Sequence, residues 1–421
     1  MRIAYITPYQ GPGLLESRPI LINLALAANV KMELVSELLQ GSGNTLEILS
    51  QGEVVDRRFK FYRAFQEPRL FDKAIPVFYA SVLPFRFVNV LWSALWTLGL
   101  FARRHRQSPY EVVIIYNLKL PQLICGLYAL IRRLPVVLEY EDDALVDVSG
   151  KIESCLVGRL YLLLVRKLLN SVAGCIGVSP HLVSAVPRDV PKVLLRGVVN
   201  EHILKLGCEP TGRKNWVVFC GTFARSKGLE QLVKAWAMVN LPDWELHIAG
   251  HGEKTEVLKE MARNDKSIVF HGLLNRDEYP KFLTKATIGI NPHDVSDTPG
   301  NVFAFKIIEY LAAGTHVITT PMGPLEEELE AGITYMADNS PKTIVETLHR
   351  VINERQYKRT ATEAAQQMYG PATVSKSLDT LLNQVRSRLT ELSESTPVSS
   401  FKSQAGSPKS SSRPAGSRLG L

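Results

Sequence analysis

Short apolar segments separated by helix-length stretches recur along the first half of the chain. Runs rich in Val and Ile occupy residues 3–7, 112–116, 135–140 and 174–178, and a stretch long enough for a helix lies between most of them. Continuously apolar strands that alternate with helices are typical of a parallel sheet whose two faces are both covered. The first half therefore predicts an α/β domain.

The second half shows the same alternation more clearly. Strands are predicted at residues 217–220, 245–249, 268–270, 287–291 and 317–320, each followed by turn residues and then by a helix. In the helix predicted at 229–239, Leu229, Leu232, Val233 and Trp236 recur at the period of one buried helix face. This pattern predicts a second α/β domain.

The domain boundaries follow from breaks in this alternation and from the length of 421 residues. We expect an N-terminal domain at 1–195, a linker at 196–210 and a C-terminal domain at 211–390. Residues 395–421 are rich in Ser, Pro and Gly, which predicts a disordered, basic tail. The tail supplies half of the net charge of +8, so the folded part is only mildly basic and no nucleic-acid partner is expected.

Composition and cysteine use are those of a soluble protein with reduced thiols. Hydrophobic content is 46% and charged content is 21%, as in ordinary globular domains. The five cysteines lack the spacing of a metal site, and their odd number favours free thiols and a cytoplasmic location. The first residues predict a strand and no signal peptide.

Residues 87–102 are nearly all apolar and are followed by Arg103, Arg104, His105 and Arg106. The run is shorter than the ~20 residues that a membrane span needs. Two interpretations remain open. The segment is either a buried helix packed on a sheet or a helix that dips into a membrane interface beside a basic cluster. The second would place the protein at the inner face of a membrane.

The segment most informative about function is 305–314. Its apolar residues share one helix face, and Gly314 stands at the position of a left-handed C-cap. Glu309 lies among these apolar neighbours, where an unpaired carboxylate is costly. Its partner is either Lys306, three residues earlier, or the hydroxyl groups of a ligand.

Cations and glycines follow the predicted strands of the second half, at the edge where ligands bind in open parallel sheets. Arg225 and Lys227 lie near the start of a helix, where the helix dipole favours acids over cations. Cations beside free helix N–H groups therefore favour a phosphate site over a solvated Arg/Lys pair. The glycines that let a ligand approach the backbone at this edge are Gly221, Gly250 and Gly252.

The strand ends of the first half carry a glycine pair, Gly11 and Gly13, and an acidic cluster. The cluster comprises Glu139, Asp142 and Asp143. It is a weak metal signal, so we expect no metal; contact with a polar acceptor and a purely structural role both remain open. The glycines do not form a dinucleotide motif, because Glu16 stands where a third glycine is required. A nicotinamide-dependent enzyme is therefore not favoured.

Motifs of the second half occur in a defined order: Gly-Thr-x4-Lys-Gly at 221–228, Ile-Ala-Gly-x-Gly at 248–252, His-Gly at 271–272, Lys-x2-Glu-Tyr-Leu-Ala-Ala-Gly at 306–314 and Met-Gly-Pro at 322–324. This order resembles the C-terminal domain of the group 1 family of retaining glycosyltransferases. The first half is similar more loosely, through its opening strand and glycine loop, residues 139–143 and residues 176–179. The resemblance implies the α/β GT-B fold, in which two Rossmann-like domains with parallel sheets face each other across a cleft.

The resemblance also implies a nucleotide-diphosphate sugar bound mainly by the C-terminal domain. Arg225 and Lys227 would hold the diphosphate, and Glu309 would accept the ribose hydroxyls. The other donor contacts would come from Gly221, Thr222, Gly250, Gly252, Leu273, Asn301, Val302 and Phe303. A saccharide or lipid-linked acceptor would lie over Gly11, Gly13 and the 139–143 loop. The sugar would be transferred with retention, without a metal or cofactor, in polysaccharide or glycoconjugate synthesis.

Two positions depart from the family pattern. Many members carry a glutamate eight positions before Glu309, and Asn301 stands there instead. Thr222 occupies a position often held by Arg, which Arg225 is placed to replace. These departures keep two alternatives open: a non-catalytic protein of this fold that binds a nucleotide sugar, and an epimerase or phosphorylase of the same fold.

Overall fold

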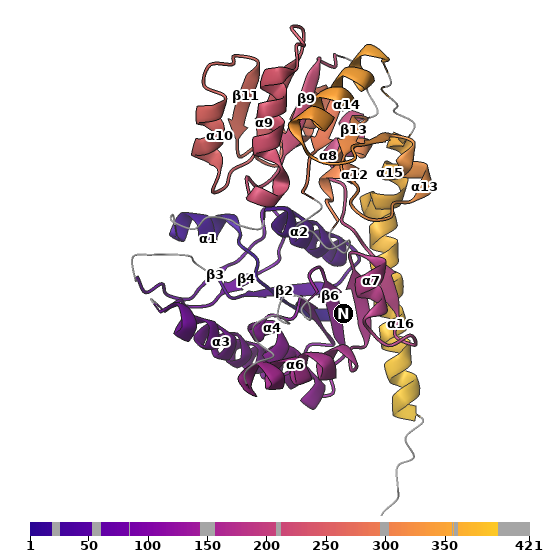
Figure 1. The fold of residues 1–421 in the computed structure, drawn as a ribbon. Coiled ribbons are helices and arrows are strands. Elements are labelled where there is room, and N and C mark those ends of the chain that lie inside the picture. Colours follow the sequence, from indigo (N-terminus) through magenta and orange to yellow (C-terminus); the bar gives the residue numbers. More distant parts are fainter. Residues whose placement is uncertain are drawn as a thin grey trace, which may run out of the picture.

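The computed structural model describes residues 1–18, 26–52, 60–83, 85–143, 156–207, 212–294, 303–355, 357 and 361–394. Its framework is two sheets, one from each half of the chain (Figure 1). The predicted tail at 395–421 lies outside the described residues, as do Asn301 and Val302.

The N-terminal sheet has eight strands in the order β3-β4-β2-β1-β5-β6-β7-β8. All neighbours pair in parallel except β3 with β4. The strands are β1 (Arg2–Thr7), β2 (Thr45–Ser50), β3 (Phe65–Glu67), β4 (Val77–Tyr79), β5 (Val112–Tyr116), β6 (Val136–Tyr140), β7 (Gly174–Gly177) and β8 (Lys192–Leu194).

Helices cover both faces of this sheet, because alternate residues of each strand point to opposite sides. Ile3 and Tyr5 of β1 pack in a core with α2, whereas Ala4 and Ile6 pack on the other face with α3, α4 and α6. The helices of this half are α1 (Pro12–Ser17), α2 (Leu26–Gly41), α3 (Arg86–Gln107), α4 (Leu120–Ile131), α6 (Leu156–Leu169) and α7 (Pro180–Ser184). None of the described helices is long and apolar enough to cross a bilayer.

The C-terminal sheet has six parallel strands in the order β11-β10-β9-β12-β13-β14. They are β9 (Trp216–Cys220), β10 (Glu245–Ala249), β11 (Ile268–Gly272), β12 (Ile288–Asn291), β13 (His316–Thr319) and β14 (Ile333–Tyr335). The helices are α8 (Glu201–Gly207), the 3₁₀ turn η1 (Arg225–Lys227), α9 (Leu229–Met238), α10 (Thr255–Met261), α11 (Glu278–Lys285), α12 (Lys306–Ala312), α13 (Glu327–Glu330), α14 (Pro341–Asn353), α15 (Thr362–Tyr369) and α16 (Pro371–Glu394).

Two helices, α8 and α16, connect the halves of the chain. The expected linker at 196–210 contains α8, and α8 packs on α11 and α12 of the C-terminal half. The expected C-terminal domain at 211–390 includes nearly all of α16. Helix α16 returns to the first half, where its Leu378 and Leu381 belong to the core of the N-terminal sheet (Figure 1). Both segments have apolar faces that local turn signals do not reveal.

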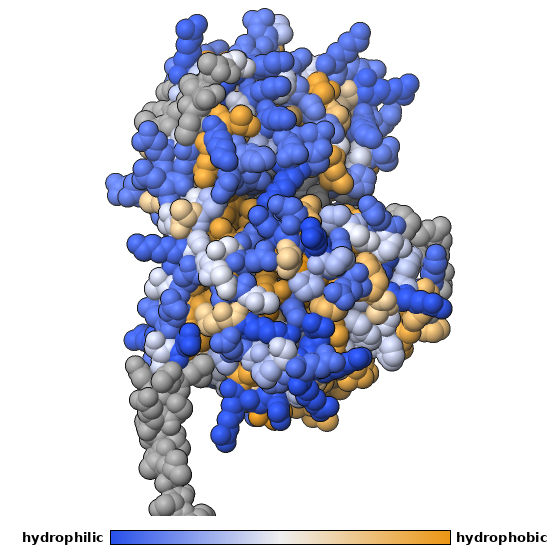
Figure 2. Space-filling model, turned by 180° about the vertical axis from the view of Figure 1, so that it is seen from behind, coloured by the Kyte–Doolittle hydropathy of each residue, from blue (hydrophilic) through white to orange (hydrophobic). Residues whose placement is uncertain are grey.

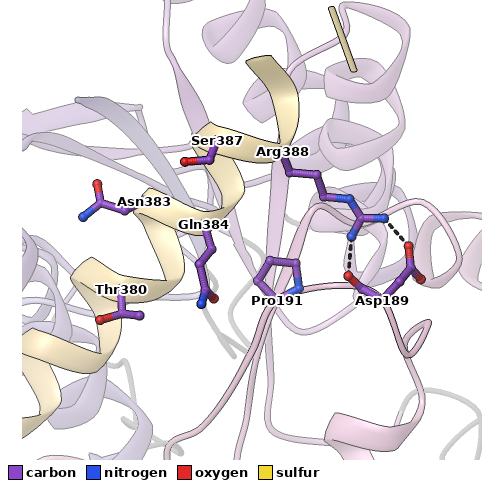
Figure 3. A pocket seen from close by; sticks show the side chains of 7 residues that line it. All are labelled: Asp189, Pro191, Thr380, Asn383, Gln384, Ser387 and Arg388. Atoms are coloured by element: carbon purple, nitrogen blue, oxygen red, sulfur yellow. Dashed lines mark hydrogen bonds and ion pairs between the residues drawn. The ribbon is translucent and has the colours of Figure 1, made fainter. Parts of the chain in front are cut away.

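An open surface pocket marks the place where α16 crosses the N-terminal domain. Figure 3 shows Arg388 of α16 reaching Asp189, beside Pro191 and Gln384 in the pocket wall. The guanidinium donates to the carbonyl oxygen of Asp189 at 2.6 Å and also to its carboxylate. This contact fastens α16 to the segment that precedes β8.

Candidate functional site

The carboxyl ends of the C-terminal strands lie along one edge of the sheet, because all six strands are parallel. Lys227 lies just beyond β9, in η1, and α9 begins two residues later. Its Nζ is 3.0 Å from Nε2 of His293, which follows β12. Burial lowers the pKa of Lys227. Arg225, in the same turn, is exposed and does not share this buried environment.

His293 acts as a neutral acceptor for Lys227. Burial, followed by the charge of Lys227, lowers the pKa of His293 to about 4. The ring is therefore neutral at pH 7. The hydrogen-bond pattern places its proton on Nδ1, which faces the carbonyl oxygen of Asp294 at 3.3 Å, and leaves Nε2 to accept from the ammonium group. The sequence showed His293 at a strand end, but only the fold brings it to Lys227.

Lys306, the first residue of α12, contributes a second buried ammonium group. Within the described residues, no hydrogen-bond acceptor lies within reach of its Nζ, which is 3.9 Å from the centre of the Phe219 ring. Burial and then the charge of Lys227 lower the pKa of Lys306 to about 7. A buried ammonium without an acceptor is costly. The repulsion between the two lysines means that a bound anion would stabilise both.

Lys306 was expected only as a partner for Glu309 and was not predicted as a site residue. A lysine in the first turn of a helix, where the dipole disfavours a cation, was the signal available. The same reasoning applied to Lys227 pointed to an anion. The burial of Lys306 beneath the strand edge depends on Phe219 and Gly221, which come from a distant part of the chain.

Glu309, one turn into α12, is half-buried, and its partner within the described residues is Tyr279 and not the expected Lys306. The hydroxyl of Tyr279, on α11, donates to Oε2 of Glu309 at 2.8 Å. Burial raises the pKa of Glu309 to about 7, although the Tyr279 hydrogen bond and the charge of Lys306 act in the opposite direction. No ion pair joins Lys306 to Glu309 among the described residues. A ligand hydroxyl therefore remains a possible second partner.

The glycines at this edge have close backbone neighbours. The amide of Gly250 donates to the carbonyl of Gly272 at 2.7 Å, and a Cβ on Gly250 would lie 1.9 Å from the carbonyl oxygen of Gly221. A Cβ on Gly252 would lie 2.7 Å from the backbone of Phe223. Gly250 and Gly252 are thus required for two loops to touch, whether or not a ligand is bound. Gly221, with φ 144°, borders the Lys306 ammonium.

The other expected donor contacts lie at different depths. Thr222 is half-buried beside Gly221, and Leu273 is 57% exposed after β11. Phe303 lies under the guanidinium of Arg196, 4.5 Å from the ring centre, and packs against cores of both halves. Asn301 and Val302 cannot be placed, because they lie outside the described residues.

The glycine loop of the N-terminal domain already has partners for its amides. The N–H of Gly11 donates to the hydroxyl of Tyr79 at 3.1 Å, and the N–H of Gly13 donates to Glu67 at 3.0 Å. Tyr79 in turn donates to Glu67 at 2.9 Å. This network fixes the loop that begins α1, so a ligand over the loop would meet side chains before it met free amides.

The acidic cluster of the N-terminal domain divides into a buried part and an edge part. Glu139 is fully buried in β6, where Tyr5 donates to it and Lys31 forms an ion pair at 3.5 Å. Lys31 also pairs with Glu141, whose pKa is raised to about 7, mainly by burial. Glu139 is therefore a poor candidate for direct contact with an acceptor.

Asp142 and Asp143 form the edge part of the cluster. Asp142 accepts from the amide of Asn117 at 2.9 Å. One oxygen of Asp143 accepts from Tyr140 at 3.2 Å, and the other lies 3.0 Å from Nε2 of His181. No group of three His, Cys, Asp or Glu within the described residues is arranged to hold a metal ion.

A direct contact joins the two domains. Arg276, in the loop after β11, donates to both carboxylate oxygens of Glu37 on α2 at 2.7 Å each. The Arg276 guanidinium also lies 5.2 Å from the centre of the Phe71 ring. The loop after β11, at the carboxyl edge of the C-terminal sheet, therefore lies against the N-terminal domain.

The two halves of the chain are α/β domains, each built on a largely parallel sheet. The arrangement is the GT-B fold. Residues 209–368 match the family described as glycosyl transferases group 1, so the resemblance of the second half is confirmed over that range. No curated protein matches the chain in sequence.

Several solved structures share the fold over nearly the whole chain. Sucrose-phosphate synthase from Thermosynechococcus elongatus is 15% identical, with a TM-score of 0.63, and the match covers 92% of this chain and 100% of that one. HepE from Anabaena, in complex with UDP-glucose, is 14% identical, with a TM-score of 0.60 and coverage of 93% and 100%. UDP-GlcNAc 2-epimerase from Neisseria meningitidis, bound to UDP-GlcNAc, is 11% identical, with a TM-score of 0.55 and coverage of 91% and 100%.

Proposed function

We propose that the protein transfers a sugar, with retention and without a metal, from a nucleotide-diphosphate sugar to a saccharide or lipid-linked acceptor. The observation that carries the proposal is the buried ammonium of Lys306, which has no acceptor among the described residues and lies in the field of Lys227. Two cations beside a strand edge suit a diphosphate, whose charge rises as the sugar leaves. Groups that are already in place at the developing charge are worth several kcal/mol, about 10²–10³ in rate.

The remaining side chains of the edge suit the other parts of the donor. Glu309 keeps a carboxylate near the site, and Tyr279 holds its Oε2. A ribose diol would donate to this carboxylate. HepE and the Neisseria epimerase, which share the fold, have been solved with UDP-glucose and UDP-GlcNAc, which supports a UDP-sugar as the first donor to test.

Lys227 and Lys306 have distinct parts in this proposal. Lys227 is held in place by neutral His293, so its ammonium is oriented before the donor arrives. Lys306 has no hydrogen-bond acceptor among the described residues, and the donor would supply one. The exposed Arg225, expected to share the diphosphate, would contribute from the solvent side. We place the reaction in polysaccharide or glycoconjugate synthesis, in the cytoplasm or at the inner face of a membrane.

The test compares purified variants in transfer from UDP-sugars to a panel of saccharide and lipid-linked acceptors. Lys227→Ala and Glu309→Ala should each reduce transfer by at least ~10²-fold, the scale of losing one transition-state contact. Lys234→Ala is the matched control, because Lys234 is exposed on the next helix and should leave transfer unchanged. Full turnover by both folded site variants would remove the assignment.

An epimerase is a second candidate, favoured by the UDP-GlcNAc 2-epimerases among the structures of the same fold. Interconversion of a nucleotide sugar in the absence of acceptor would establish it. Phosphorylase activity would instead require free phosphate. Calorimetry with UDP-, GDP- and ADP-sugars tests the non-catalytic alternative, since binding without turnover across the acceptor panel would support a sugar-binding protein.

A further inference from the structure

Helices α3 and α6 each expose a continuous apolar stripe. The exposed side chains of α3 recur at helical spacing, with Leu91 53% exposed, and those of α6 do the same, with Leu156 83% exposed. The opposite faces of both helices are buried against the N-terminal sheet. The exposed apolar residues are Phe85, Val88, Val90, Leu91, Trp92 and Leu95 from the first segment and Leu156, Val157, Leu160 and Leu163 from the second.

The two stripes belong to one surface. Helix α4 packs on both α3 and α6, and the three helices cover the same side of the N-terminal sheet (Figure 1). Ile131, at the end of α4, is 78% exposed. Figure 2 shows hydrophobic side chains at the lower end of the molecule, among hydrophilic ones. We call this surface, formed by α3, α4 and α6, the α3–α6 face. Apolar patches of this kind mark interaction sites.

The charged side chains that α3, α4 and α6 contribute to the α3–α6 face have one sign. The sequences of α3, α4 and α6 contain no Asp or Glu. Their exposed cations, together with those directly after α4, are Arg103, Arg106, Arg132, Arg133, Arg159, Arg166 and Lys167. Apolar side chains beside cations without acids are the composition of surfaces that lie on anionic lipid. A second copy of the chain is a poor occupant, because contact through this face would bring like charges together.

The apolar halves of α3 and α6 lie toward the carboxyl edge of the N-terminal sheet. Each helix connects two parallel strands, so it runs back from the carboxyl edge and its first turns lie nearest that edge. The exposed leucines occupy those first turns. Asp142 and Asp143 follow β6 at the same edge.

We propose that the α3–α6 face docks on an anionic bilayer. The apolar side chains enter the boundary between headgroups and acyl chains, and the arginines contact lipid phosphates. This docking would hold the carboxyl edge of the N-terminal sheet close to the bilayer. Resting on the proposed transfer function, this placement favours a lipid-linked acceptor over a free saccharide.

The test is sedimentation of the full chain with phosphatidylcholine vesicles, with and without phosphatidylglycerol. Binding should require the anionic lipid and weaken as salt increases. The double variant Leu91→Ser/Leu160→Ser should reduce binding at least about 10-fold, as should Arg106→Gln/Arg166→Gln. Met238→Ser is the control, because Met238 is an exposed apolar residue of α9 in the other domain and should bind as the unchanged protein does.

Three results would overturn the proposal. They are failure of the full chain to bind anionic vesicles, binding by both double variants as strong as that of the unchanged protein, and loss of binding on deletion of 395–421 alone. A change of oligomeric state in the leucine variant would assign the face to self-association instead. Calorimetry with UDP on the unchanged protein keeps the two proposals separate. If the unchanged protein binds UDP but not anionic vesicles, docking alone is contradicted. If it binds anionic vesicles but not UDP, the donor site alone is contradicted.

Discussion

Replacing Lys306 by Met should stabilise the free protein while it removes donor binding. Methionine fills a similar volume with an uncharged, flexible chain, so the packing against Phe219 is largely kept. The substitution removes a buried ammonium that has no acceptor among the described residues. A site residue that opposes folding is expected where a ligand supplies the missing partner.

The size of the effect follows from the pKa of Lys306. A fall from 10.5 to about 7 corresponds to about 4–5 kcal/mol at 1.36 kcal/mol per unit, and at pH 7 about 4 kcal/mol of this acts against folding. The substitution also removes the cation–π contact with Phe219, worth about 1–2 kcal/mol when desolvated. The variant should therefore be about 2–3 kcal/mol more stable than the unchanged protein at pH 7.

The stability difference between the variant and the unchanged protein should depend on pH. The pKa of Lys306 is lower in the folded state, so between about pH 7 and 10.5 the unfolded chain binds more protons than the folded one. The stability contributed by this group therefore rises with pH across that window, and the Met variant lacks the rise. The advantage of the variant should be largest near pH 7 and nearly gone at pH 10. Glu309 titrates between 4.5 and about 7, below this window.

Urea unfolding of both proteins at several values between pH 7 and 10, followed by tryptophan fluorescence, measures the difference. Calorimetric titration with UDP at pH 7 gives the second readout and should show binding only by the unchanged protein. A variant that is less stable at every pH would show that Lys306 has an internal partner. Undiminished UDP binding by the variant would separate Lys306 from the donor.

Two further predictions concern neighbouring residues. Tyr279→Phe removes the donor to Glu309, so the pKa of Glu309 should rise further, with a stability loss of about 1–2 kcal/mol in urea unfolding and weaker UDP binding at pH 7. Gly228→Ala places a Cβ 1.8 Å from the carbonyl oxygen of Pro292 at φ 69°, so unfolding should occur at a lower temperature by several degrees. Gly41→Ala has open space around it and should not lower this temperature.

The sequence predicted those strands whose apolar runs are unbroken. β5 and β10 have the predicted bounds, whereas β2 was not predicted although all but its first residue are buried. Glu47 interrupts its apolar pattern, and its partners Arg2 and Arg104 come from distant segments. Strands β3 and β4 have three residues each, too few for a period.

The candidate site divides in the same way between local and distant information. Lys227 and Glu309 could be singled out because each conflicts with its own helix, one by charge and the other by hydrophobicity. His293 and Tyr279 carry no such local conflict, and only the fold brings them within 3.0 Å and 2.8 Å of those residues. Residues that orient other side chains are predicted poorly from sequence, because nothing in their neighbouring sequence conflicts with their residue type.

Without a ligand, Lys306 and Glu309 at the carboxyl edge of the C-terminal sheet have no single preferred protonation state at neutral pH. Both have a pKa of about 7, the lysine lowered and the glutamate raised, mainly by burial. The charged and neutral forms of the two groups therefore have similar free energies at neutral pH. A diphosphate would favour the protonated lysine and ribose hydroxyls would favour the ionised glutamate, so the proposed nucleotide sugar would fix both charges at once. Inorganic diphosphate or a nucleoside alone would fix only one, so a nucleoside diphosphate, free or within the donor, is the ligand expected to relieve the cost of both groups.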